Sequence, residues 1–450
     1  MPPTGAKPQF TLLLLSAAEL MVVLDFTIVA VALPDIQRDL GIAESRLQWL
    51  LSAYALANSG FLLLGGRAAD LFGRRRIVLA GIGLFTLASL VGGLARDPVT
   101  LIAMRALQGL GGAAIVPAVL SIVTTTFAEG APRNRAIGIL GAISAIGFSA
   151  GMVAGGVITE RWGWPGVFWV NVPIGIVLMA TIPFVVAERR DAAGQGSDVA
   201  GALSVTLGLA VLAHGIAELG APSWRGPLAL AAGGALLGIF VAVERRTPAP
   251  MLPLSVFASS RVALATFLEL MLGAAVTPLV FLLTLHFQGV AGYSALMTGL
   301  AFLPHGLAAI VVMGPISRLI TRLGPRTVTL AGIALYVVGA VPLLRLTPES
   351  GYVRDLLPAL LVTAPGLMAA FIAVFVAGTS AVGPDRQGLI SGLLATAQQV
   401  GASLGLALMG ALIADGRGLQ PGFVALIVLS AAAIVPALLL PRRPAAAATG

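Results

Sequence analysis

An aspartate stands in an apolar stretch near the N-terminus, in the segment LDFTIVAVALP at residues 24–34. Asp25 is surrounded by leucine, phenylalanine, isoleucine and valine, where an ionised side chain is energetically costly. Burial favours the neutral form of a carboxyl group, and a nearby cation favours its charged form. A change in the surroundings of Asp25 would therefore make it bind or release a proton.

A candidate partner lies in the segment RALQGLGGAAIVPAVL at residues 105–120. Gln108 and Gly109 follow Arg105 by three and four residues, so the three positions share one face of a helix. Charged side chains within membrane spans usually face the interior of a helix bundle and have a partner there. Arg105 is therefore predicted to pair with a buried acid; the alternative is that it extends to the outer interface.

The composition indicates which elements position these residues. Of the 450 residues, 58% are hydrophobic and 10% are charged, and the mean hydropathy is +0.99. Average domains carry about 25% charged residues, whereas a helix that crosses a bilayer needs about 20 mostly apolar residues. The sequence therefore predicts an all-α integral membrane protein with many spans.

Several function classes have no support in the sequence. Cysteine is absent, which excludes disulfides, thiol catalysis and thiolate metal sites. The three histidines are scattered and the arginines are spread among short loops, so we expect no metal, no cofactor and no nucleic-acid partner. A membrane enzyme or receptor is the alternative class, but there is no nucleotide-binding loop, nucleophile elbow or soluble catalytic domain. We expect that the protein is not an enzyme.

Apolar runs between charged, proline-rich and glycine-rich breaks predict fourteen spans. They are 10–33, 47–66, 77–95, 99–122, 136–158, 167–187, 199–217, 227–243, 262–285, 297–317, 327–346, 356–380, 388–413 and 421–440. The spans at 199–217 and 227–243 are the weakest, and their length favours keeping them.

The distribution of basic residues predicts the orientation of the chain. With the N-terminus in the cytoplasm, 18 of the 27 Lys and Arg residues fall on the cytoplasmic side, 8 fall outside and Arg105 lies within a span. Cytoplasmic loops are expected to carry such an excess. Lys7 is the only lysine, a bias that indicates a GC-rich bacterial genome. The prediction is a multi-pass protein of the bacterial cytoplasmic (inner) membrane with both termini cytoplasmic.

The chain also contains an internal repeat. GGRAADLFGRRRIVLAG at residues 65–81 is echoed by GPISRLITRLGPRTVTLAG at residues 314–332. Two related halves with a binding site between them at the membrane midplane are typical of secondary transporters. We therefore expect a six-helix half at 1–190, an inserted hairpin at 191–258, a second six-helix half at 259–441 and a disordered cytoplasmic tail at 442–450.

The first copy of the repeated loop has the pattern G-x-x-x-D-x-x-G-R-[RK], formed by Gly66, Asp70, Gly73, Arg74 and Arg75. Glycines permit tight turns and close backbone approach. Asp70 can accept hydrogen bonds from a helix N-terminus or from an arginine on a neighbouring element. Such a contact can be made in one state and broken in another, which makes this segment a candidate gating loop; the alternative is an ordinary cytoplasmic loop.

A ridge of glycines lies in the fifth predicted span. Gly147, Gly151 and Gly155 recur every four residues on one helix face, and Gly156 follows directly. Such a ridge allows another helix to approach closely. The alternative is a packing surface of the kind that many membrane bundles contain.

With these motifs in this order, the sequence resembles the major facilitator superfamily, and within it the fourteen-helix drug:proton antiporters of the EmrB/QacA type. LDFTIVAVALP is similar to the family's first-helix motif, GRAADLFGRRR to its loop between helices two and three, and RALQGLGGA to its fourth-helix motif. The glycines from Gly138 to Gly156 follow its antiporter motif, and the segments WVNVPIG at 169–175 and HFQGVAGYSALMTGLAFLP at 286–304 are also in its style. Ala30 stands where the family has Asn, and Met152 where the antiporter motif has the proline that would kink the helix.

The resemblance implies a proton-coupled efflux transporter that exports amphipathic drugs or antibiotics by alternating access, as a monomer in the bilayer. The alternatives are a dedicated exporter of one metabolite made by the cell, and a proton symporter. Asp25 and Arg105 lie at similar depths, about three and about five residues outward of the middle of their spans. Movement of one relative to the other would let proton and substrate compete for one cavity; the alternative is a permanent structural ion pair.

Two further acids lie in predicted spans. Glu19 precedes Asp25 by six residues, about 240° around a helix, so the two do not share a face. Glu269, in the segment TFLELML, opens the second half and is the second candidate for proton coupling. Glu19, Gln108 and Glu269 are the candidates for the substrate cavity, since a carboxylate among apolar and aromatic walls suits a cationic drug. The alternative for Glu269 is burial against a serine or a backbone group.

Overall fold

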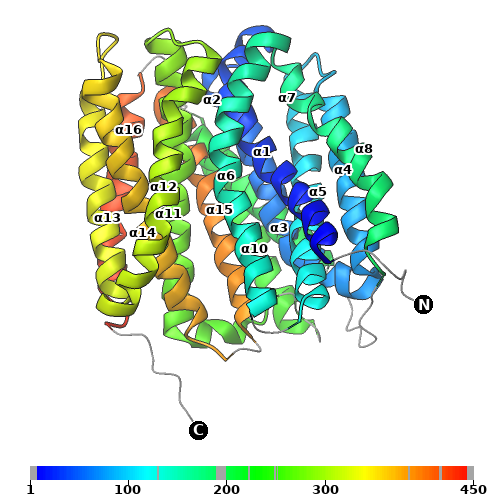
Figure 1. Cartoon of the computed structure of the whole chain (residues 1–450). Coiled ribbons are helices and arrows are strands. Elements are labelled where there is room, and N and C mark those ends of the chain that lie inside the picture. Colours follow the sequence, from blue (N-terminus) through cyan, green and yellow to red (C-terminus); the bar gives the residue numbers. More distant parts are fainter. Residues whose placement is uncertain are drawn as a thin grey trace. The chain divides into compact units, whose positions relative to one another are not determined.

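The computed structural model of the chain describes residues 8–128, 131–188, 199–220, 223–247, 250, 252–383, 386–414 and 418–442. In these residues the chain consists of helices joined by short connections (Figure 1). The tail expected at 442–450 lies outside the described residues, apart from Arg442.

The helices up to residue 246 correspond to the first eight predicted spans, 10–33 to 227–243. They are α1 (Pro8–Leu40), α2 (Glu44–Leu47), α3 (Trp49–Phe72), α4 (Arg74–Gly92), α5 (Pro98–Thr126), α6 (Ala131–Trp162), α7 (Pro165–Trp169), α8 (Asn171–Val185), α9 (Val199–Ala217), the short η1 (Glu218–Gly220) and α10 (Arg225–Arg246).

The rest of the chain begins with the short η2 (Leu254–Ala258). It continues with α11 (Ser260–Leu285), the π-helical turn η3 (His286–Val290), α12 (Ala295–Leu323), α13 (Pro325–Ala340), η4 (Val341–Arg345), the π-helical turn η5 (Tyr352–Leu356), α14 (Leu357–Thr379), α15 (Gln387–Ile413), α16 (Gln420–Ala432) and α17 (Ile434–Ala437).

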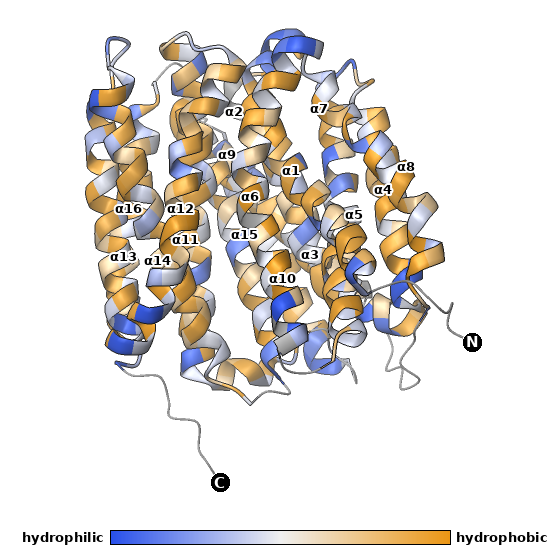
Figure 2. Cartoon of the chain, in the orientation of Figure 1, coloured by the Kyte–Doolittle hydropathy of each residue, from blue (hydrophilic) through white to orange (hydrophobic). Residues whose placement is uncertain are grey.

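Fourteen helical stretches of the described residues are long and apolar enough to cross a membrane, which confirms the predicted number of spans. The two weakest predictions correspond to α9 and α10. Figure 2 shows apolar residues along the labelled helices and hydrophilic residues at many of the helix ends. This pattern matches segments that place their middle in lipid and their ends in water.

The predicted span over 167–187 corresponds to one membrane-crossing stretch, Pro165–Val185. Within it, α7 and α8 meet at Val170. Pro173 explains the break, because it lacks the N–H that would donate to the Trp169 carbonyl in a continuous helix. The break makes Asn171 the first residue of α8.

The chain forms two compact units. The first contains Met1–Ala43, Trp49–Ala210 and Ala232–Leu252, and the second contains Glu44–Gln48, Val211–Ala231 and Pro253–Gly450. Helices α9 and α10 are therefore each divided between the two units.

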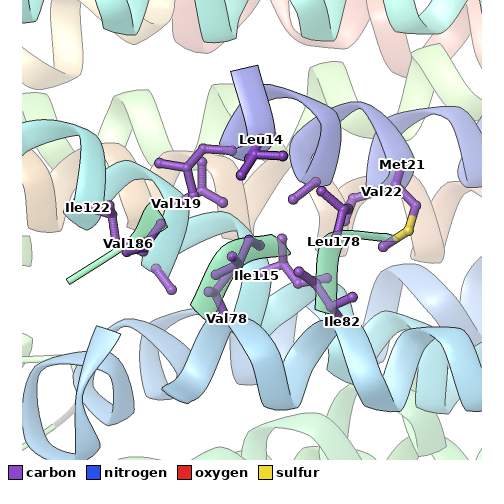
Figure 3. Close-up of a cluster of buried hydrophobic side chains, with 14 of the residues drawn as sticks. Leu14, Met21, Val22, Val78, Ile82, Ile115, Val119, Ile122, Leu178 and Val186 are labelled. Carbon is purple, nitrogen blue, oxygen red and sulfur yellow. The ribbon is translucent and has the colours of Figure 1, made fainter. Parts of the chain in front are cut away.

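Within the first unit, α5 packs against α3 and α4, and α1 packs against α6 and α8. Apolar side chains from α1, α4, α5 and the α8 segment form a buried cluster that Figure 3 shows; its labelled members are Leu14, Met21, Val22, Val78, Ile82, Ile115, Val119, Ile122, Leu178 and Val186. In a membrane, close packing rather than exclusion of water holds such helices together. This cluster fixes the four segments that carry the candidate site.

The second unit repeats these pairings. There α14 packs against α12 and α13, as α5 packs against α3 and α4, and α11 packs against α15, as α1 packs against α6. The internal repeat of the loop sequences therefore has a counterpart in the helix pairings within each unit.

Candidate functional site

Asp25 is the centre of a buried hydrogen-bond network in the first unit. Its Oδ2 accepts a hydrogen bond from Arg105 Nη1, and its Oδ1 accepts from Gln108 Nε2 at 2.9 Å and from Asn171 Nδ2 at 2.8 Å. Asp25, Arg105 and Gln108 are all 0% exposed, and Asn171 is 1% exposed. We call Asp25, Arg105, Gln108, Asn171 and Ser89 the Asp25 network.

The guanidinium of Arg105 is held from several directions. Its Nε donates to the Leu50 carbonyl on α3 at 2.9 Å, and its Nη1 also donates to Gln108 Oε1 at 2.7 Å. Its Cζ lies 4.6 Å from the centre of the Tyr54 ring, a cation–π distance. The Nη2 atom is buried and has no hydrogen-bond partner among the described residues. Arg105 therefore keeps one donor that a water molecule or a ligand could use.

Gln108 links the ion pair to α4. Its Nε2 donates to Ser89 Oγ at 2.8 Å as well as to Asp25, while its Oε1 accepts from Arg105. Ser89 in turn donates to the Phe85 carbonyl at 2.7 Å. Both ends of the Gln108 amide are thus occupied, which fixes its orientation.

Local sequence explains how α5 presents its two network residues. Asp97 caps the helix, because its carboxylate accepts hydrogen bonds from the Thr100 hydroxyl at 2.7 Å and the Thr100 N–H at 2.9 Å. These hydrogen bonds to the charged form lower the pKa of Asp97, with the Thr100 hydroxyl as the larger cause. Arg105 and Gln108 then lie one helical turn apart on the face that meets α1 and α3.

The ion pair of Asp25 and Arg105 is fully buried. Desolvation of two ions costs several kcal/mol each, so such a pair is tolerable only with excellent geometry and further hydrogen bonds. The network supplies them, since Asp25 accepts three side-chain donors and Arg105 donates to Leu50 and Gln108 as well.

The sequence alone did not indicate Asn171, Ser89 or Tyr54 as site residues. Asn171 carried a usable signal, because it is a lone amide in the apolar segment WVNVPIG, two residues before a proline that interrupts the helix. Ser89 and Tyr54 carried no comparable signal, since single hydroxyl groups are common in membrane helices.

Glu269 and Glu19 lie outside this network. Glu269 is on α11 in the second unit and is 2% exposed, and its Oε1 has no hydrogen-bond partner in the part of the chain that the structure describes. Glu19 is half-buried on α1, about one and two-thirds turns before Asp25, and interacts electrostatically with Tyr54. A buried carboxylate oxygen without a donor could accept a hydrogen bond from a ligand at Glu269.

In the candidate gating loop, Asp70 pairs with Arg74 of the same motif at 3.4 Å. Helix α3 ends at Phe72 and α4 begins at Arg74, and Gly73 between them has a φ of 106°, which side chains other than hydrogen rarely allow. A Cβ added at Gly66 would lie 3.4 Å from Pro117 Cβ, an ordinary contact distance.

The partner of this loop on a neighbouring element is Glu188, which the sequence did not indicate. Its Oε1 accepts the Arg75 N–H at 3.2 Å, and its Oε2 lies 3.7 Å from Arg75 Nε and 3.8 Å from Arg76 Nε. Arg75 Nη1 also donates to the Pro183 and Val186 carbonyls at the end of α8. A Cβ at Gly73 would collide with the Glu188 carboxylate, so glycine permits this contact as well as the turn.

The glycine ridge of α6 lies against α1. A Cβ at Gly147 would meet Leu20 and Val23, one at Gly151 would collide with Thr27, and one at Gly155 would lie 2.9 Å from the Cα and carbonyl oxygen of Ile28. Gly156 and Met152 are buried on the same helix. The ridge therefore brings α6 close to the helix that carries Asp25.

We expect Gly155→Ala to destabilise the protein by about 1–3 kcal/mol, because the added methyl group meets backbone atoms that cannot move aside. Gly138→Ala is the matched control on the same helix, where nothing lies within 4 Å of the added Cβ. It should leave stability unchanged or raise it slightly, since alanine favours helix. The apparent melting temperatures of the purified variants check this, and equal values for the two would contradict the close approach of α6.

Among the residues that the structure describes, no group of three His, Cys, Asp or Glu side chains could hold a metal ion. The chemistry that the Asp25 network can perform is proton binding at Asp25 and hydrogen bonding through Arg105.

Comparison with known proteins gives consistent results. The model of the Major Facilitator Superfamily matches residues 15–406. The cephamycin export protein CmcT of Amycolatopsis lactamdurans is 39% identical, over 92% of this chain and 87% of the relative. The puromycin resistance protein pur8 of Streptomyces alboniger is also 39% identical, over 90% of this chain and 82% of the relative. The crystal structure of the POT family transporter PepTSo aligns with a TM-score of 0.72 at 14% identity, over 97% of both chains, a likeness of fold alone.

Proposed function

Because the chain belongs to the Major Facilitator Superfamily, a family of membrane transporters, we propose that it is a proton-coupled antiporter that exports amphipathic compounds. The observation that carries this proposal is the buried pair of Asp25 and Arg105 in a chain whose relatives include proteins named for antibiotic export and resistance. Asp25 is the proton-carrying group, and Arg105 stabilises its charged form.

Coupling follows from competition for the network. While Arg105 is bonded to Asp25, the carboxylate is stabilised and stays ionised. A conformational change that draws Arg105 or Gln108 away removes that stabilisation, and Asp25 then takes up a proton. Because proton and substrate compete for the network, binding of the substrate displaces this proton. The unpaired Nη2 of Arg105 is a donor that a carbonyl group of the substrate can use.

Glu269 is the proposed binding group in the second unit for a cationic part of the substrate. An unpaired carboxylate oxygen suits an amine or another cationic group of an amphipathic substrate. Gln108 and Glu19 are the polar candidates for substrate binding in the first unit. Glu269 is also the second candidate for proton coupling.

The proposed transporter is a monomer that works by alternating access. We propose that the loop of Gly66, Asp70, Gly73, Arg74 and Arg75 gates the cytoplasmic side, with Glu188 as its partner. Both termini lie in the cytoplasm and the bacterial inner membrane is the location. Residues 1–190 and 259–441 act as the two six-helix halves, with 191–258 as the inserted hairpin.

A dedicated exporter of one compound that the cell itself makes is the second candidate. The relative named for cephamycin export favours it, because that name describes a single compound class. The two candidates differ in the breadth of the substrate range and not in the role of Asp25.

Reconstitution into liposomes tests the proposal. We expect uptake of tetraphenylphosphonium, an amphipathic cation, or of puromycin above the level of protein-free liposomes when the vesicle interior is more acidic than the medium, and loss of this difference when a protonophore removes the gradient. A symporter would instead accumulate substrate when the medium is the acidic side. Equal uptake with and without a gradient would contradict proton coupling.

A further inference from the structure

We infer that Asn171 is a positioning residue that adapts to both protonation states of Asp25; this inference rests on the proposed role of Asp25 as the proton carrier. Asn171 Nδ2 donates to Asp25 Oδ1 at 2.8 Å, across 146 residues of sequence. The side chain is 1% exposed and stands at the start of α8, directly after the break at Val170.

The two states of Asp25 need different neighbours. An ionised carboxylate only accepts hydrogen bonds, whereas a neutral carboxyl group carries one O–H that must find an acceptor. In the structure three donors surround Asp25, from Arg105, Gln108 and Asn171. This arrangement suits the ionised state, so protonation requires at least one neighbour to present an acceptor.

Gln108 cannot make this change without breaking other bonds. Its Oε1 accepts from Arg105 while its Nε2 donates to Ser89. If the amide turned over, Nε2 would face the Arg105 donor and Oε1 would face the Ser89 oxygen, so both hydrogen bonds would be lost. Arg105 has no acceptor atom at all.

Asn171 has the freedom that Gln108 lacks. In the described part of the chain its side chain has one hydrogen-bond partner, which is Asp25. The last torsion of an asparagine side chain is roughly two-fold, so a half-turn exchanges Nδ2 for Oδ1. Nδ2 faces the ionised carboxylate, and Oδ1 can accept the O–H of the neutral carboxyl group.

Few other charges act on Asp25. The elements packed against α1 are α3, α5, α6, α7 and α8. Arg105 on α5 and Tyr54 on α3 face Asp25, and the sequences of α7 and α8 contain no acidic or basic residue. The other charged residues of α1, α3 and α6 are Glu19, Asp35, Arg38, Asp39, Arg67, Asp70, Arg133, Arg135, Glu160 and Arg161, most of them near helix ends.

The position of Asn171 connects the protonation of Asp25 with the candidate gating loop through one helix. Helix α8 begins with Asn171 at the Asp25 network and ends at the Pro183 and Val186 carbonyls that bind Arg75. The same helix therefore contacts the proton-carrying group at one end and the candidate gating loop at the other.

The test is a pH titration of the carboxyl band of purified protein by infrared difference spectroscopy, without substrate. The band that Asp25→Asn removes is assigned to Asp25. We expect Asn171→Leu to move its midpoint upward by about one pH unit, because a hydrogen bond to the charged form is lost and the weaker one to the neutral form offsets only part of it. Asn171→Asp should move it further upward, since a second carboxylate disfavours ionisation.

Asn58→Leu is the matched control. Asn58 is also buried in the first unit, but it donates to the Gly109 carbonyl at 3.3 Å and not to Asp25. It should lower stability and leave the midpoint unchanged. A wild-type midpoint in Asn171→Leu would overturn the inference, and Asn171→Ala, which also removes the amide and adds no charge, decides if Asn171→Leu does not fold.

The proposed function can fail separately from this inference. If no titrating band disappears in Asp25→Asn, Asp25 is not the proton carrier and the inference about Asn171 falls with it. If the Asp25 band titrates and shifts as expected while transport in liposomes needs no proton gradient, the antiport proposal fails and the role of Asn171 stands.

Discussion

Asp25→Asn should abolish uphill transport in liposomes while downhill exchange of substrate persists. Asparagine keeps the size of the side chain and can still bond to Arg105 through its oxygen, but it cannot ionise. Each proton that moves down a pH gradient equivalent to 100 mV contributes roughly 2.3 kcal/mol, which supports about a fifty-fold concentration ratio. Loss of that coupling removes accumulation altogether and does not merely slow it. The measurement is the steady-state ratio of puromycin or tetraphenylphosphonium across the vesicle membrane.

Asp39→Asn is the control for this experiment, because Asp39 lies on the same helix but bonds to Trp164 Nε1 at 2.7 Å. It should keep its proton-driven accumulation. If Asp25→Asn still accumulates substrate to the wild-type ratio, Asp25 is a structural partner of Arg105 and Glu269 is the next residue to test. Lowered stability of Asp25→Asn with unchanged proton dependence leads to the same conclusion.

Arg105→Gln should strongly destabilise the protein. Removal of one partner from a buried ion pair leaves an uncompensated charge and typically costs about 3–5 kcal/mol. Glutamine also cannot donate to the Leu50 carbonyl and to Asp25 together in the geometry of the guanidinium. The variant should show a lower apparent melting temperature and little transport.

The double variant Asp25→Asn with Arg105→Gln separates charge from shape. It should recover part of the lost stability, because no unpaired charge remains, and it should stay unable to accumulate substrate. Arg354→Gln is the control, since Arg354 forms an exposed pair with Asp355 and its loss should hardly change the melting temperature. A double variant that is less stable than Arg105→Gln would contradict the ion-pair argument.

Local features of the sequence were sufficient to predict the membrane helices. Fourteen spans were predicted and the structure contains fourteen helices of suitable length and composition. The span predicted at 167–187 corresponds to Pro165–Val185, and the sequence did not indicate that the helix is interrupted within it at Val170, because a single proline often stays within a membrane helix when neighbouring groups satisfy the freed carbonyl. Helix length and hydropathy depend on neighbouring residues, so they can be derived without tertiary contacts.

The sequence predicted candidate site residues only where the spacing within a single helix, or its apolar surroundings, pointed to them. Arg105 and Gln108 share a face because of the helical period, and Asp25 stood out because of its apolar neighbours. Their functional roles remain predictions.

The other partners depend on how helices pack. Asn171 meets Asp25 from 146 residues away, and Glu188 meets Arg75 from 113 residues away. Such contacts require the depth and rotation of α8 relative to α1 and α4, which packing at positions such as Gly175 against Thr86 sets. The sequence by itself determined the helices, their number and the charged residues that they bury. Only the tertiary structure decided which polar atoms satisfy those charges, because a hydrogen bond between helices needs both partners at one depth and facing each other, and neither helix encodes that relation alone.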